Sequence, residues 1–243
     1  MESKPTLRLF VAIDPGPEVI RAAGEQIAAL RPSAPNARWV RSETLHVTLA
    51  FLGERPAADV QPIAEALSAV AARHAPFDLS FGGGGVFGRP ARPRVLWMRC
   101  ASSPVALTRP LVETGDLVRP HIETGAPAGR YAETGVLASS HIETGAPAGR
   151  QGETDALGAL EADVTGALAP FGHTPDRRGH SAHLTLARSR DPGGDRQLAT
   201  CVPLLDAAPA RTVRVEEVTL YESQLGRAGP TYRALVTAKL RDC

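Results

Sequence analysis

One five-residue phrase occurs twice in this chain of 243 residues, as HVTLA at 46–50 and as HLTLA at 183–187. Side chains two residues apart on a β-strand point to the same face of the sheet. If both phrases are strands, each packs its leucines into a core, where Phe51 is also expected, and presents three other residues on the opposite face. These are His46, Thr48 and Ala50 in the first phrase, and His183, Thr185 and Ala187 in the second.

Two such strands side by side would direct two imidazoles into one cleft, which is the arrangement that paired acid and base catalysis needs. The alternative is an internal duplication kept for core packing. Packing explains the repeated leucines, but it does not explain a histidine and a threonine repeated on the other face. We therefore interpret His46 and His183 as catalytic residues, and Thr48 and Thr185 as residues that bind the substrate.

The sequence around both phrases resembles a known family. The HxTx pattern is that of the 2H phosphoesterase superfamily. Further segments are similar to the bacterial RNA 2′,3′-cyclic phosphodiesterases, historically called 2′-5′ RNA ligases, namely LRLFVAID, RWVRSETLHVTLAFLG, RPRVLWM, HLTLAR and LYESQLGRAGPTY. The resemblance extends from about Leu7 to Leu240, and it departs at Ala182, where that family usually has proline.

The resemblance implies metal-independent hydrolysis of a 2′,3′-cyclic phosphate, on an RNA end or a nucleotide, to a 2′-phosphomonoester without any cofactor. It assigns His46 as the proton donor to the leaving ribose oxygen and His183 as the acceptor of a proton from water. Two imidazoles with ordinary pKa values of about 6.5 can hold opposite protonation states near neutral pH. The residues alone do not decide which histidine has which role.

Three other functions remain open from the sequence. The chain could be a module that binds RNA ends or nucleotides without turnover, or a 2′-5′ oligonucleotide phosphodiesterase. It could also be a metallohydrolase that uses the two motif histidines together with His121 and His141 of the repeated segment. Turnover in the presence of EDTA separates these classes.

Charge and cysteine content limit the kinds of partner, structural site and cellular location that we expect. Lys and Arg total 27 against 26 for Asp and Glu, so the formal net charge is only +1. This balance argues against a long footprint on duplex nucleic acid, although not against the binding of one phosphate or a short RNA end. The cysteines are widely spaced, at Cys100, Cys201 and Cys243, which predicts neither a disulfide framework nor a zinc site. With no candidate signal peptide or membrane span, we expect a cytoplasmic monomer.

Hydrophobic periodicity predicts an α+β fold with two pseudo-symmetric lobes, whose antiparallel sheets face a central cleft and whose helices lie outside. Strands are expected at Leu7–Ile13, at 37–41 paired with 45–52, and within 76–81, 95–99, 183–187, 213–220 and 232–240; helices are expected within 20–30, 60–70, 157–168 and 198–205. Strand 95–99 is expected to complete the first lobe.

Two further residues are candidates for substrate binding. Phe10 lies opposite the leucines of its strand, so it could stack on a base or belong to a second packed face. Arg188 follows the second phrase directly and could clamp a phosphate. Strand alternation places Arg188 opposite His183, however, so a local twist would be needed, and a plain surface arginine is the alternative.

Two segments do not fit the regular pattern. The run GGGGVFGRP at 82–90 lacks the Lys-Ser/Thr pair of a P-loop and leads into a strand, so we interpret it as a flexible connection. Between about 110 and 154 the segment HIETGAPAGR recurs after 20 residues and contains few apolar side chains. We expect a flexible insert that interrupts a single domain over 1–243, and no metal site at its histidines, His121 and His141.

Overall fold

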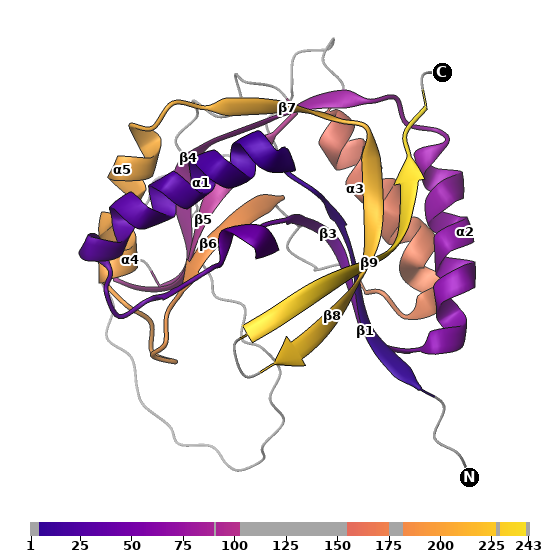
Figure 1. Ribbon diagram of the computed structural model, residues 1–243, viewed down its shortest axis with the longest axis horizontal. Helices are drawn as coiled ribbons and strands as arrows, with labels where there is room; N and C mark the ends of the chain where they lie inside the picture. Colours follow the sequence, from indigo (N-terminus) through magenta and orange to yellow (C-terminus); the bar gives the residue numbers. More distant parts are fainter. Residues whose placement is uncertain (1–4, 90, 103–154, 175–181, 227–228, 242–243) are drawn as a thin grey trace, which may run out of the picture. The chain divides into compact units, whose positions relative to one another are not determined.

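The computed structural model describes residues 5–89, 91–102, 155–174, 182–226 and 229–241. The predicted insert at 110–154, with His121 and His141, lies outside these residues. Helices pack against a curled sheet in the described part (Figure 1), and every strand pairing is antiparallel. The α+β prediction is confirmed.

The strands form one hydrogen-bonded sheet in two halves. One half has the order β7-β4-β5-β6 and the other has the order β3-β1-β8-β9, while the short strand β2 pairs with β6. The halves join through a single pairing, Val47 with Leu184. The strand bounds are β1 (Thr6–Ile13), β2 (Arg38–Trp39), β3 (Val47–Pro56), β4 (Phe77–Arg89), β5 (Arg92–Ala101), β6 (His183–Arg188), β7 (Arg211–Val215), β8 (Glu217–Gly226) and β9 (Gly229–Lys239).

The two halves of the sheet are not the two halves of the sequence. Strands β4 and β5 precede the insert and pair with each other, yet β5 also pairs with β6, which carries the second motif. Strands β8 and β9 come at the end of the chain, yet β8 pairs with β1 beside the first motif. The expectation that strand 95–99 completes the first lobe was therefore wrong, as was the pairing of 37–41 with 45–52, because β2 pairs with β6.

Within the described residues, five helices lie against the sheet (Figure 1): α1 (Gly16–Leu30), α2 (Val60–Ala71), α3 (Ala156–Leu168), α4 (Gln197–Thr200) and α5 (Val202–Asp206). Short 3-10 turns occupy Arg31–Ser33, Ser42–Thr44, Ala57–Asp59 and Ala169–Phe171. Helix α1 begins with a proline in its first turn and buries Val19, Ala23, Ile27 and Leu30, which recur at helical spacing. No helix in the described part is both long enough and apolar enough to cross a membrane.

One core lies between the helices and the sheet. It contains Leu9, Val11 and Ile13 of β1, as their alternation predicts, together with the buried faces of α1, α2 and α3. Phe10 and Trp97 are also buried, at 3% and 1% exposure, but they lie outside this core cluster. The sheet is therefore packed on both faces, and its second face carries the motif histidines.

The glycine run was predicted wrongly. All of 82–89 belongs to β4, and Gly85 pairs with Trp97 on β5. A β-carbon at Gly85 would overlap the indole ring of Trp97, and one at Gly84 would lie 2.9 Å from Cβ of Leu205. The glycines therefore allow close packing on both faces of a strand, where a flexible connection was expected from the sequence.

Candidate active site

The two repeated phrases meet where the halves of the sheet join. Val47 directly follows His46 and pairs with Leu184, which directly follows His183. Continuing this antiparallel register by one residue in each direction places His46 opposite Thr185 and Thr48 opposite His183. The two histidines are then diagonal neighbours on one face, for which regular ladders give a Cα separation of about 7–8 Å. All four side chains are half-buried.

Each motif contains a β-bulge at the same position. Val11 pairs with Ala50 and Ala12 with Thr48, so Leu49 is an extra residue in β3. On β6, Leu96 pairs with Ala187 and Trp97 with Thr185, so Leu186 is the extra residue. A bulge of this kind reverses the alternation of the residues that follow it. The leucine and the alanine of each phrase are accordingly both in the core, which corrects the expectation that Ala50 and Ala187 share the histidine face.

The bulge supplies the local twist that Arg188 needs in order to reach the motif face. Beyond the extra residue Leu186, alternation returns Arg188 to the face of His183 and Thr185. The side chain is exposed, and its positive charge acts on His46 and on Tyr232 of β9. Arg188 thus belongs with the motif residues, although simple alternation along β6 placed it on the far face.

His46 lies against two aromatic rings. Its ring centroid is 4.9 Å from that of Phe10 and 5.0 Å from that of Tyr232, which meets it edge-on. Phe10 also stacks on Tyr221 at 5.2 Å and meets the edge of Tyr232 at 4.9 Å. With 3% exposure and these contacts, Phe10 supports His46 and has no free face for a base. Of the two interpretations of Phe10, the structure favours the packed face.

The surroundings of His46 fix its tautomer. Nδ1 lies 2.9 Å from the carbonyl oxygen of Thr44, which can only accept a hydrogen bond, so Nδ1 carries the proton and Nε2 is the exchanging atom. Burial lowers the pKa of His46, the bond to Thr44 opposes this, and the charge of Arg188 lowers the pKa further. His46 is therefore biased toward the neutral imidazole in the free protein.

His183 has its own pair of rings on the other half of the sheet. Its ring centroid is 4.9 Å from Phe87, edge-on, and 6.0 Å from Trp97. Phe87 and Trp97 stack at 5.0 Å, and Gly85 provides the space for the indole. Trp97 thus supports the ring of His183, as Phe10 supports the ring of His46.

Several residues of this face were not predicted from the sequence. Tyr232 is half-buried; burial raises its pKa, whereas the nearby positive charges of Arg188, Arg41 and Arg8 lower it. Arg41 also donates to the carbonyl oxygen of Pro230, two residues before Tyr232, at 2.7 Å. For Tyr232 the sequence predicted only a strand within 232–240. No short sequence motif identifies Arg8 or Arg41 as residues of this face.

Simple alternation also predicts the wrong face of the strand for Phe51. It was expected in the core, but the bulge at Leu49 precedes it and it is 48% exposed. The guanidinium of Arg8 lies 4.9 Å from the centre of its ring. Phe51 occupies the position in β3 that Arg188 occupies in β6, so the two motifs end in an aromatic ring and a cation.

Among the residues described, no group of three or more His, Cys, Asp or Glu side chains is arranged to hold a metal ion. The Nδ1 atom of His173 is 3.1 Å from the carbonyl oxygen of Phe51, so this nitrogen is hydrogen-bonded to the backbone of β3. His180, the other histidine before the second motif, lies outside the described residues.

Relatives with curated names support a common family. Residues 13–97 and 150–232 match the model of the LigT like Phosphoesterase family. An RNA 2′,3′-cyclic phosphodiesterase of Geobacillus stearothermophilus is 40% identical over 88 residues, which are 36% of this chain and 28% of that protein. One of Aeropyrum pernix is 26% identical over 88% of this chain and 94% of its own length. The alignments with the first three relatives span 28%, 49% and 51% of their lengths, thus about half or less.

Solved structures show the same fold. A protein of Thermus thermophilus has a TM-score of 0.63 at 21% identity and covers 97% of this chain and 98% of its own. Escherichia coli LigT, solved in complex with 3′-AMP, has a TM-score of 0.58 at 22% identity and covers 98% of this chain and 100% of its own. Because the family model matches well over half of the residues, the chain belongs to the LigT-like phosphoesterases of the 2H superfamily.

Proposed function

We propose that this phosphoesterase hydrolyses RNA 2′,3′-cyclic phosphate ends to 2′-phosphomonoesters without a metal ion, with His46 and His183 as general acid and base. The observation that supports this most directly is the pairing of Val47 with Leu184. Extended by one residue in each direction, this antiparallel register would place each histidine opposite the threonine of the other motif. The curated relatives named RNA 2′,3′-cyclic phosphodiesterases support the choice of substrate.

The chemistry needs two proton transfers on opposite sides of one phosphorus atom. One imidazole removes a proton from water as the water oxygen bonds to phosphorus. The other imidazole donates a proton to the ribose 3′ oxygen as its bond to phosphorus breaks, which leaves the phosphate on the 2′ oxygen. Each group is worth about 10²–10⁴-fold in rate. Thr48 and Thr185, between the histidines, would hydrogen-bond the nonbridging oxygens and hold the phosphate in line.

The resemblance to the family assigns His46 as acid and His183 as base. The free protein biases His46 toward its neutral form, so it must gain a proton at Nε2 before it can act as the acid. An anionic phosphate beside His46 offsets the charge of Arg188 and favours the imidazolium. Substrate binding would then prepare the acid, and Arg188 would serve as the phosphate clamp.

The terminal base of the RNA needs an aromatic ring other than Phe10 on which to stack. Phe10 is enclosed, but Phe51 is exposed and has Arg8 over its ring. We propose Phe51 as the surface on which the terminal base stacks, since stacking on an aromatic face tolerates any base. Phe10 is then a positioning residue that supports His46.

Initial rates on a 2′,3′-cyclic mononucleotide in EDTA test this proposal, with a 2′-5′-linked dinucleotide as the competing substrate. Turnover of the cyclic nucleotide that is unaffected by EDTA is the expected result. Tight binding with no turnover would make the protein a binding module. Loss of activity in EDTA would indicate a metallohydrolase, and preferential cleavage of the dinucleotide would indicate a 2′-5′ phosphodiesterase.

A further inference from the structure

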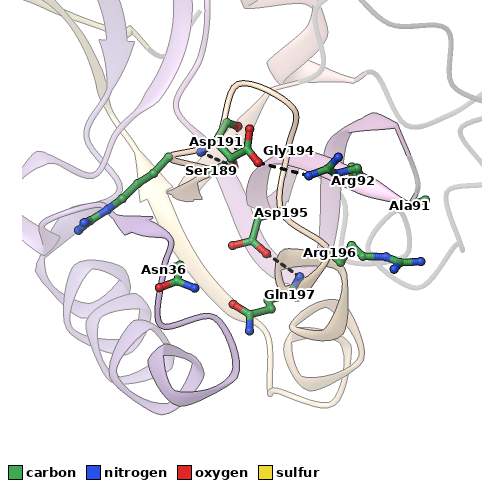
Figure 2. Close-up of a pocket in the computed structure, with 10 residues that line it drawn as sticks. Asn36, Ala91, Arg92, Ser189, Asp191, Gly194, Asp195, Arg196 and Gln197 are labelled. Atoms are coloured by element: carbon green, nitrogen blue, oxygen red, sulfur yellow. Dashed lines mark hydrogen bonds and ion pairs between the residues drawn. The ribbon is translucent and has the colours of Figure 1, made fainter.

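A polar pocket begins one residue beyond Arg188. It has a volume of about 660 Å³ and lies between the turn that follows β6 and the start of β5 (Figure 2). Its lining comes from three places in the sequence: Asn36, Ala91 with Arg92, and the segment Ser189–Gln197. None of these residues is used by the proposed chemistry.

The pocket carries positive charge that is not fully neutralised. Arg92 is paired with Asp191 at 3.3 Å, and the carboxylate of Asp195 accepts the backbone N–H of Gln197 at 2.9 Å. Arg190 and Arg196 also line the pocket, and neither has an ion-pair partner within the described residues. Arg188, on the motif face, directly precedes Ser189, the first residue of the turn after β6 that lines the pocket.

Two amide side chains and one carboxylate also line the pocket. Figure 2 shows the amides of Asn36 and Gln197 and the carboxylate of Asp195 on one side, and Arg92 and Arg196 on the other. Oε1 of Gln197 is buried and has no hydrogen-bond partner among the residues described. A buried acceptor without a donor costs free energy.

We propose that this pocket binds the RNA chain upstream of its cyclic end, with a phosphate on Arg190 and Arg196 and a ribose hydroxyl or base edge on the amides. The assignment rests on the proposed function and deepens it, because it makes the preferred substrate an oligonucleotide. The pocket combines separate cationic and amide sides, as a nucleotide unit requires. A cyclic mononucleotide held between the two histidines would not reach it.

The test compares a 2′,3′-cyclic mononucleotide with cyclic-ended oligonucleotides of two to four residues. In the Arg190→Ala/Arg196→Ala double variant, kcat/KM on the mononucleotide should be unchanged. On the longer oligonucleotides it should fall about tenfold or more at low salt, mainly through KM. The slope of log kcat/KM against log salt should also become shallower by about 0.7, since a single-stranded chain contributes about 0.7 for each phosphate that is neutralised.

A matched control removes the same charge elsewhere. Lys239 and Arg241 are exposed at the end of β9, and the Lys239→Ala/Arg241→Ala variant should retain the full oligonucleotide rate and salt slope. An equal loss in both double variants would show a general charge effect and overturn the proposal. So would a wild-type protein without any preference for the longer substrates, or a double variant that retains this preference.

Failure of the proposed function has a different signature. In that case the wild-type protein would not hydrolyse even the cyclic mononucleotide. Competition by free AMP or inorganic phosphate separates the possible sources of the phosphate. One outcome is that AMP or phosphate inhibits oligonucleotide hydrolysis at concentrations that leave mononucleotide hydrolysis unaffected. If the double variant then loses this inhibition but retains the oligonucleotide rate, the pocket binds a free anion, and its assignment to RNA is wrong.

Discussion

At the scale of single residues, each motif histidine is held against aromatic rings on one side and is half-buried toward the other. For His46 this packing lowers the pKa by burial, while the carbonyl of Thr44 fixes the proton on Nδ1. Positioning and pKa adjustment therefore come from the same contacts. Phe10 and Trp97 have these supporting parts, although neither lies in either motif.

Replacement of either histidine tests the paired mechanism. His46→Ala and His183→Ala should each lower kcat by about 10²–10⁴-fold, because each removes one of two required proton transfers. The double variant should lose far less than the product of the two effects, since the residues act as a unit. Thermal melting serves as the folding control, and a single variant that melts normally yet keeps most of its rate would contradict the pairing.

The charge of Arg188 predicts a shift in the pH profile. We expect kcat/KM to be bell-shaped, because one histidine must be charged and the other neutral. Arg188 lowers the pKa of His46, so Arg188→Ala should raise that pKa and move the limb that depends on His46 to higher pH. Arg188→Lys, which keeps the charge, should leave the limb nearly in place. Identical profiles for Arg188→Ala and the wild-type protein would refute this coupling.

At the scale of the elements, the bulges show where sequence reasoning succeeds and where it fails. The core face of β1 follows from alternation, and the structure places it as predicted. Ala50, Ala187, Phe51 and Arg188 were assigned to the wrong face because an extra residue in a ladder has no signature in one sequence. The glycine run was predicted wrongly for a related reason. A glycine is needed there because Trp97, on another strand, leaves no space for a side chain.

That close contact gives a prediction for β4. Gly85→Ala should displace Trp97 and with it the ring support of His183, which lowers kcat more than it changes KM. Gly166→Ala is the matched control, since Gly166 lies inside helix α3 with no atom within 4 Å of an added β-carbon. It should stabilise the protein by about 0.5–1 kcal/mol without a change in rate. Full activity in a folded Gly85→Ala variant would show that Trp97 has no such role.

At the scale of the whole molecule, strands from both ends of the sequence share each half of the sheet. We propose that the chain from 1 to 243 is one bilobal domain and that the repeats at about 110–154 are an insert between β5 and α3. Ser102, just after β5, donates to the carboxylate of Asp155, the N-cap of α3, at 2.8 Å. The two flanks of the insert therefore lie close enough for a short linker to join them.

Excision of residues 111–153 with a short linker tests this organisation. Loop-closure entropy changes only slowly with length, so the melting temperature should change little. Hydrolysis of a cyclic mononucleotide should also persist, since both motif strands are intact. Loss of folding would show that the repeats are structural. A normal melt with loss of activity on oligonucleotides alone would instead assign them a role in contacting the substrate.

Identification of the product by phosphorus NMR tests the central claim most directly. The substrate is an oligonucleotide with a 2′,3′-cyclic phosphate end, treated with the wild-type protein in EDTA. Two histidines that act on opposite sides of the phosphorus, with the 3′ oxygen as leaving group, predict a single new resonance from a 2′-phosphomonoester. A 3′-phosphomonoester, a mixture of both isomers, or no product at all would contradict the account.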